Sequence, residues 1–90
     1  MTESAHTFNS TDTAKMLDMY LAFCEARSAN QPTAAAYADY SKFAKVVAGE
    51  AASAAHGPFY KPADQAAAEK ALQGVFAAAV AADPRFDAYR

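Results

Sequence analysis

Few residues of this chain could do covalent chemistry, and their spacing does not bring them together. The sequence holds one cysteine, Cys24, and two histidines, His6 and His56. A nucleophilic thiol needs solvent access and a neighbouring base or cation, whereas Cys24 falls on the apolar stripe of a helix predicted over residues 11–29. We therefore expect Cys24 to be a small buried core residue, and we predict that the chain is not an enzyme.

Metal ligands are equally sparse. A single cysteine excludes an intramolecular disulfide, a CxxC redox pair and a thiolate zinc cluster. Glu25, Glu50 and Glu69 are not followed three residues later by histidine, so the Glu-x-x-His pattern of di-iron helical bundles is missing at these positions. We therefore predict no metal site and no cofactor, and the cysteine content leads us to expect a cytoplasmic protein.

Arg27 is the residue that breaks the pattern of the first predicted helix, because it falls on the apolar side instead of the polar side. An arginine in the last turn of a helix lays its methylene groups over the edge of a core and keeps its head near the free carbonyls, which is the favoured interpretation. The alternative is a small-molecule pocket between the helices, in which Arg27 binds an anionic group. The expected lining of that pocket is Tyr20, Tyr37, Tyr40 and Phe76.

Two adjacent aromatic residues stand in a short connection stiffened by proline, the segment 56–62. Rigid aromatic side chains are the usual anchors of protein interfaces, so this loop is the best candidate contact site. Either ring can instead fold back and pack on the end of the bundle. A third arrangement combines the two, with one ring in the contact site and the other packed on the bundle. The predicted binding residues are His56, Phe59, Tyr60 and Lys61, together with Arg27.

The charge balance argues against nucleic acid as a partner. The formal net charge is −2 and the pI is near 5.5, so attraction to phosphates is not expected. Lys42, Lys45 and Lys61 form a strip that acidic residues interrupt, which a solvated helix face explains better. A nucleic-acid-binding regulator is the least favoured function. The longest apolar run, residues 75–82, is far shorter than the ~20 residues that span a bilayer, so we predict no membrane partner.

Composition and capping residues predict the elements. Alanine, the strongest helix former, fills 26 of 90 positions. Asn30 is suited to a left-handed helix end, Pro32 and Pro62 to a first helical position, and Gly57 with Pro58 to a stop. These signals predict an all-α, antiparallel three-helix bundle. Its helices should cover residues 11–29, 33–55 and 62–83, within a single domain over residues 10–90 that follows a flexible arm over residues 1–9.

The helix faces are predicted from the periodicity. The apolar side of the second helix should carry Ala36, Tyr37, Tyr40, Phe43, Ala44, Val47, Ala51 and Ala54. The third helix should present one stripe of large residues, which are Leu72, Val75, Phe76, Ala79 and Val80. Its opposite stripe is small and includes Ala67, Ala71, Gly74 and Ala78.

The small stripe raises the question of a second copy. A glycine inside a helix costs about 1 kcal/mol relative to alanine, so we expect Gly74 to allow the close approach of another helix, within the chain or across a homodimer that completes the bundle. The sequence as a whole predicts a non-catalytic protein-protein interaction module, of an accessory, regulatory or inhibitor type. A small-molecule-binding protein is the alternative.

Overall fold

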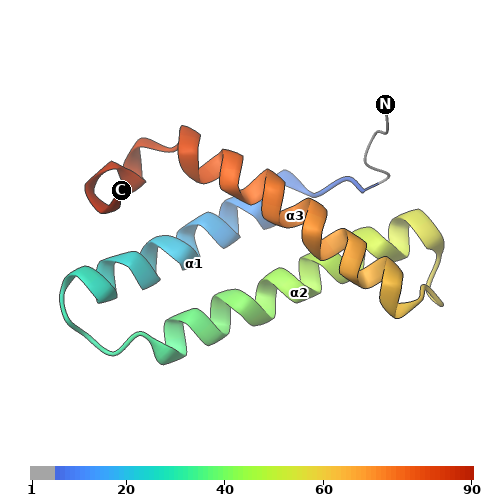
Figure 1. Ribbon diagram of the computed structural model, residues 1–90, viewed down its shortest axis with the longest axis horizontal. Helices are drawn as coiled ribbons and strands as arrows, with labels where there is room; N and C mark the ends of the chain where they lie inside the picture. Colours follow the sequence, from blue (N-terminus) through green and yellow to red (C-terminus); the bar gives the residue numbers. More distant parts are fainter. Residues whose placement is uncertain (1–5) are drawn as a thin grey trace.

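The computed structural model describes residues 6–90, and all the regular elements within them are helices (Figure 1). Helix α1 spans Ser10–Ser28, α2 spans Ala34–His56, α3 spans Pro62–Ala82, and a short 3-10 helix, η1, spans Pro84–Tyr89. No strand occurs in the described part of the chain. The predicted all-α fold with three long helices is confirmed, and each predicted boundary lies within one residue of the observed one.

Side chains and turns end the helices where the sequence indicates. Asn9 caps α1, because its Oδ1 accepts a hydrogen bond of 2.7 Å from the backbone N–H of Thr11. At the other end Asn30 has φ 57°, and the N–H of Gln31 donates to the carbonyl of Ala26 at 2.9 Å, which closes a Schellman turn. Pro32 does not begin α2, because Thr33 takes the N-cap position.

The connection between α2 and α3 is fixed at both ends. Gly57 has φ 90°, a backbone conformation that glycine adopts without strain, and its N–H donates to the carbonyl of Ser53 at 2.8 Å. Pro62 is the first residue of α3, and the N–H of Lys61 before it donates to Asp64 Oδ2 at 2.9 Å. These interactions terminate α2 sharply and start α3 a few residues later.

The helices form a flat molecule, about 42 × 27 × 19 Å. In Figure 1, α1 and α2 run side by side in opposite directions, and α3 crosses them obliquely so that its second half diverges from α2. η1 folds back toward α1 and places Phe86, which is 2% exposed, with its ring centroid 5.8 Å from that of Tyr20. The C-terminal segment therefore closes the open end of the bundle.

Small side chains make up much of the core. Alanines at the α2–α3 contact allow the two backbones to approach closely, and a few larger residues fill the remaining space. The residues of this core cluster are Met16, Val47, Ala48, Ala52, Ala68, Leu72 and Phe76. Phe8 also packs against the cluster; residues 1–5 of the predicted arm lie outside the described residues.

The predicted side of α2 is partly wrong. Ala48 and Ala52 are buried, whereas Ala54 is exposed and Tyr37 is half exposed. The reason is that α2 has two neighbours, α1 and α3, so the buried arc shifts along the helix toward α3 near its C-terminal end.

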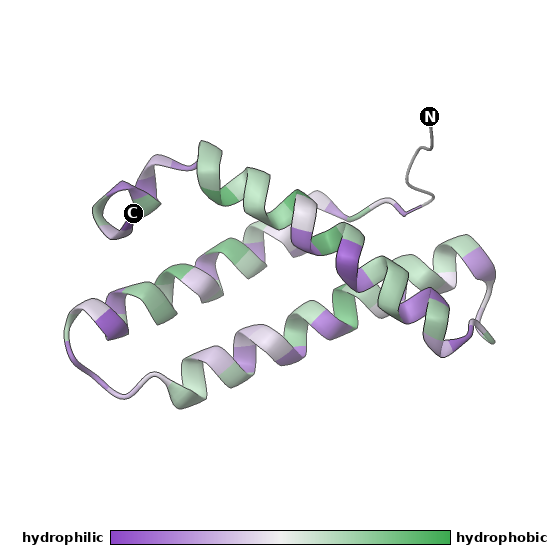
Figure 2. Cartoon of the chain, viewed as in Figure 1, coloured by the Kyte–Doolittle hydropathy of each residue, from purple (hydrophilic) through white to green (hydrophobic). Residues whose placement is uncertain are grey.

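On α3 the stripe of large residues needs one correction, since Val75 is 45% exposed. The small stripe is largely exposed, and most residues of α3 are hydrophobic, as the colouring of Figure 2 shows. A Cβ added to Gly74 would meet no atom within 4 Å. Gly74 therefore has no packing role among the described residues, and the homodimer stays a prediction.

Candidate interaction surface

The two rings of the loop at residues 56–62 point in different directions. Phe59 is 95% exposed. Tyr60 packs against the core cluster, and its hydroxyl lies over Gly49, where an added Cβ would be 3.1 Å from that oxygen. One ring therefore plugs the bundle end and the other projects into solvent, which is one of the arrangements expected from the sequence.

The loop that carries Phe59 is tied at both sides. His56 Nε2 lies 3.7 Å from Asp64 Oδ1, so the last residue of α2 contacts the first turn of α3. The ring of His56 also meets the ring of His6 edge-on, with centroids 5.9 Å apart. With Pro58 and Pro62 restricting the backbone, Phe59 is presented on a connection that has little freedom to rearrange. Lys61 is exposed beside it.

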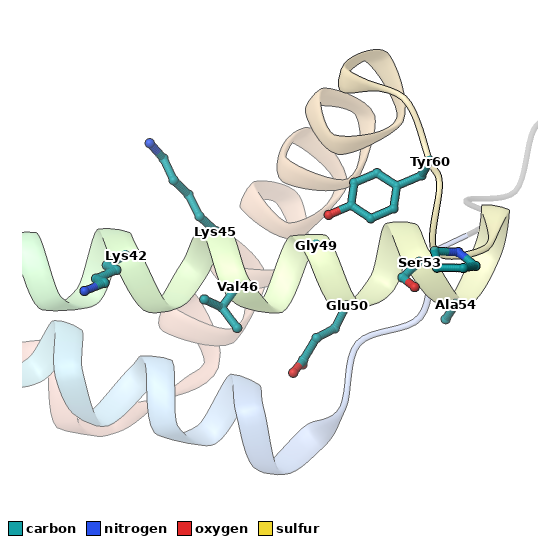
Figure 3. Close-up of a pocket in the computed structure, with 9 residues that line it drawn as sticks. Lys42, Lys45, Val46, Gly49, Glu50, Ser53, Ala54 and Tyr60 are labelled. Atoms are coloured by element: carbon teal, nitrogen blue, oxygen red, sulfur yellow. The ribbon is translucent and has the colours of Figure 1, made fainter.

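A wide, open groove of about 810 Å³ lies next to the loop on the outward face of α2 (Figure 3). Tyr60 and Pro58 border it at the loop end, and the lysines border it toward the middle of α2. Val46, which is 51% exposed, contributes apolar surface between them. The residues that line the groove are Lys42, Lys45, Val46, Gly49, Glu50, Ser53, Ala54, Pro58 and Tyr60.

The charged residues at the groove differ in whether they have a partner within the chain. Neither Lys42 nor Lys45 forms an ion pair with another residue of the range 6–90. Glu50 points toward α1 in Figure 3, and a hydrogen bond with the Asp12 side chain raises the pKa of Glu50 above its usual value. Glu50 is thus oriented toward Asp12, and the two ammonium groups remain available to an acidic partner.

Sequence reasoning missed most of this groove. Val46 and Ala54 are exposed apolar residues on the outward side of α2, and an exposed valine among charged residues is the signal that could have indicated the surface. We refer to Phe59 together with the residues that line the groove as the loop surface.

Arg27 does not join the loop surface. Arg27 is in the last turn of α1, where its guanidinium carbon lies 5.2 Å from the centroid of the Phe23 ring. The connection that carries Phe59 is at the other end of α2 (Figure 1). Stacking on Phe23 fits the favoured interpretation, in which the side chain covers the edge of the core.

The four residues expected to line a pocket do line one. A cavity of about 430 Å³ is bordered by Tyr20, Tyr37, Tyr40, Gln73, Phe76, Ala77 and Val80. Arg27 is not among its lining residues, so no arginine is placed there for an anion.

Of the residues with chemical reactivity, the two histidines come together, which their spacing in the sequence did not indicate: the ring centroids of His6 and His56 lie 5.9 Å apart. Cys24 is buried at 2% exposure, as predicted. In the described range no three His, Cys, Asp or Glu side chains gather in a group that could hold a metal ion, and none of the helices found there has the length and apolar character needed to cross a membrane. Comparison of the chain with protein-family models, with curated proteins and with solved structures found no match.

Proposed function

We propose that this chain is a non-catalytic protein-protein interaction module that binds its partner through the loop surface. The observation that carries the proposal is the exposure of Phe59, 95%, on a loop held at both ends. Burying a phenylalanine side chain contributes about 1.5–3 kcal/mol. Because the loop is already ordered, little of that gain is lost to fixing it on binding.

The surroundings of Phe59 indicate the chemistry of the partner. The groove offers apolar surface from Val46, Ala54 and Pro58, bordered by the ammonium groups of Lys42 and Lys45. A protein surface with a pocket for one aromatic ring and carboxylates opposite the lysines complements this arrangement. The proposed role is accessory, regulatory or inhibitor-like, and the cysteine content supports a cytoplasmic location.

The experiment compares partner capture by the wild-type chain with capture by Phe59→Ala. Val75→Ala is the matched control, because it also removes an exposed apolar side chain, on α3. Tyr60 is left intact since it packs against the core. A partner recovered from the native host and then purified should bind Phe59→Ala about 10–100-fold more weakly and Val75→Ala unchanged. Circular dichroism checks that all three chains keep their helices.

Equal binding of the partner by Phe59→Ala and the wild type contradicts the proposal. A loss of binding in both variants also contradicts it, because binding would then depend on α3 or on general surface hydrophobicity. The proposed contact requires that the loss follow Phe59 alone.

A further inference from the structure

A second surface lies away from the loop, in the groove between α2 and α3 near the first half of α2. Its main cavity of about 430 Å³ is within the range of about 300–1,000 Å³ that small-molecule sites occupy. A neighbouring cavity of about 230 Å³ shares Tyr37, Tyr40, Gln73 and Phe76 with it. The rest of its lining is Met16, Ser41, Ala44 and Leu72 together with two opposite charges, Lys45 and Glu69. The shared residues make the two hollows parts of one groove.

The wall of this groove is mainly aromatic. The ring centroids of Tyr20 and Tyr40 are 5.3 Å apart, those of Tyr40 and Phe76 are 5.3 Å apart, and those of Tyr20 and Phe76 are 5.4 Å apart with an angle of 87° between the planes. These are favourable ring contacts, so the three rings hold one another in place. They present a continuous ring surface to the groove, which suits a flat ring compound that packs against it by stacked and edge contacts.

The main cavity is lined without charge. Its residues are tyrosine, phenylalanine, glutamine, alanine and valine. Burial and the neighbouring tyrosines raise the pKa of Tyr40 to about 12, so this phenol is neutral at physiological pH. An ionic ligand would lose part of its hydration here without meeting an opposite charge. The lining therefore favours an uncharged ligand.

Hydrogen-bonding groups are nevertheless present. The hydroxyls of Tyr20, Tyr37 and Tyr40 make no hydrogen bond to another residue of the described range, and Gln73 adds an exposed amide. A phenol hydroxyl both donates and accepts. These groups can orient a ligand that carries a hydroxyl or an amide.

We propose that the groove walled by Tyr20, Tyr40 and Phe76 binds an uncharged compound of two or three fused rings that carries a hydroxyl or amide group. The main cavity shares no lining residue with the loop surface, and Lys45 is the one described residue that borders both the loop surface and the neighbouring hollow. Ligand binding in the main cavity does not depend on the proposed protein partner. Phe59→Ala therefore leaves ligand binding unchanged, and failure of one proposal does not decide the other.

The test uses four naphthalene probes that share one ring system: 2-naphthol, naphthalene itself, 2-naphthoate and a naphthyl-trimethylammonium. Each is titrated into the ¹⁵N-labelled full chain, and amide chemical shifts report where it binds. 2-Naphthol should cause saturable shifts at the lining residues Tyr20, Tyr37, Tyr40, Gln73, Phe76 and Ala77. It should bind about 3–10-fold more tightly than naphthalene, the worth of one net hydrogen bond, and more tightly than either ion.

Two variants with equal added bulk locate the site. Ala77 lines the groove, whereas the adjacent Ala78 is exposed and does not. Ala77→Trp should weaken 2-naphthol binding at least tenfold because the indole fills the groove, and Ala78→Trp should not. Shifts that map elsewhere, no saturable shift with 2-naphthol up to about 5 mM, tighter binding of the anion or the cation, or equal effects of the two variants overturn the proposal.

Discussion

Replacing Gly74 with alanine should stabilise the single chain. The residue lies in the middle of α3, and a Cβ placed there would meet no atom within 4 Å. Alanine is better than glycine in a helix interior by about 0.8–1.0 kcal/mol, and nothing in the described structure offsets that gain. For a domain of this size, 1 kcal/mol raises the melting temperature by about 4–8 °C.

The assay is thermal and urea unfolding followed by circular dichroism at several protein concentrations. Gly57→Ala is the control with the opposite sign, because Gly57 has φ 90° and the substitution should destabilise by about 1 kcal/mol or more. Gly49→Ala should gain less than Gly74→Ala, since its Cβ would sit 3.1 Å from the Tyr60 hydroxyl and 3.3 Å from Gln65 Oε1. These three glycines separate helix propensity from local crowding.

A loss of stability in Gly74→Ala would refute this reasoning. It is the outcome expected if the small stripe of Ala67, Ala71, Gly74 and Ala78 packs against a second copy, as the proposed homodimer requires, because an added methyl group would push the two helices apart. The loss of stability would then grow with protein concentration. Sedimentation would show that the wild type is a dimer and that Gly74→Ala is a monomer. A gain of about 1 kcal/mol at every concentration leaves Gly74 without a partner.

Two further predictions concern stability. Phe86→Ala should destabilise by about 3–5 kcal/mol, because Phe86 is the buried residue of η1 and is 2% exposed; a change under about 1 kcal/mol in urea unfolding would show that η1 contributes little. The raised pKa of Glu50, whose ordinary value is 4.5, means that the folded chain holds this proton more tightly than the unfolded chain, so its contribution to stability falls as pH rises from 4.5. Glu50→Gln should therefore gain stability relative to the wild type as pH rises above about 4.5, and parallel curves of urea midpoint against pH would contradict this.

The helices could be predicted because their boundaries are set locally. Asn9, Asn30, Gly57 and Pro62 act on backbone groups within a few residues of themselves, so their effect is legible in the sequence. Which face of each helix is buried was harder to predict from the sequence. Alanine is equally suited to an exposed helix position and to a close helix contact, and the sequence alone does not distinguish fully buried Ala48 from exposed Ala54.

The candidate surface was predictable to the same extent. Adjacent rings between prolines mark the loop, but which ring turns inward depends on Gly49, a residue eleven positions before Tyr60 that leaves space for its hydroxyl. The aromatic cavity was anticipated in its four named residues because they share one side of their helices. Arg27, which the sequence suggested as the anion-binding residue of that pocket, does not line the cavity and instead stacks on the ring of Phe23 on the same helix.

Phe59 and the main aromatic cavity lie at opposite ends of α2. The helix ends at His56, sixteen residues after Tyr40, a distance of about 24 Å along its axis, and Phe59 follows beyond that end. α2 packs against both α1 and α3, and the structure shows no second conformation of α2 that could couple its two ends. Coupling between distant sites requires an element with two states that both sites bias. A protein partner on Phe59 and a ring compound beside Tyr40 should therefore bind independently, which makes each surface a control for the other.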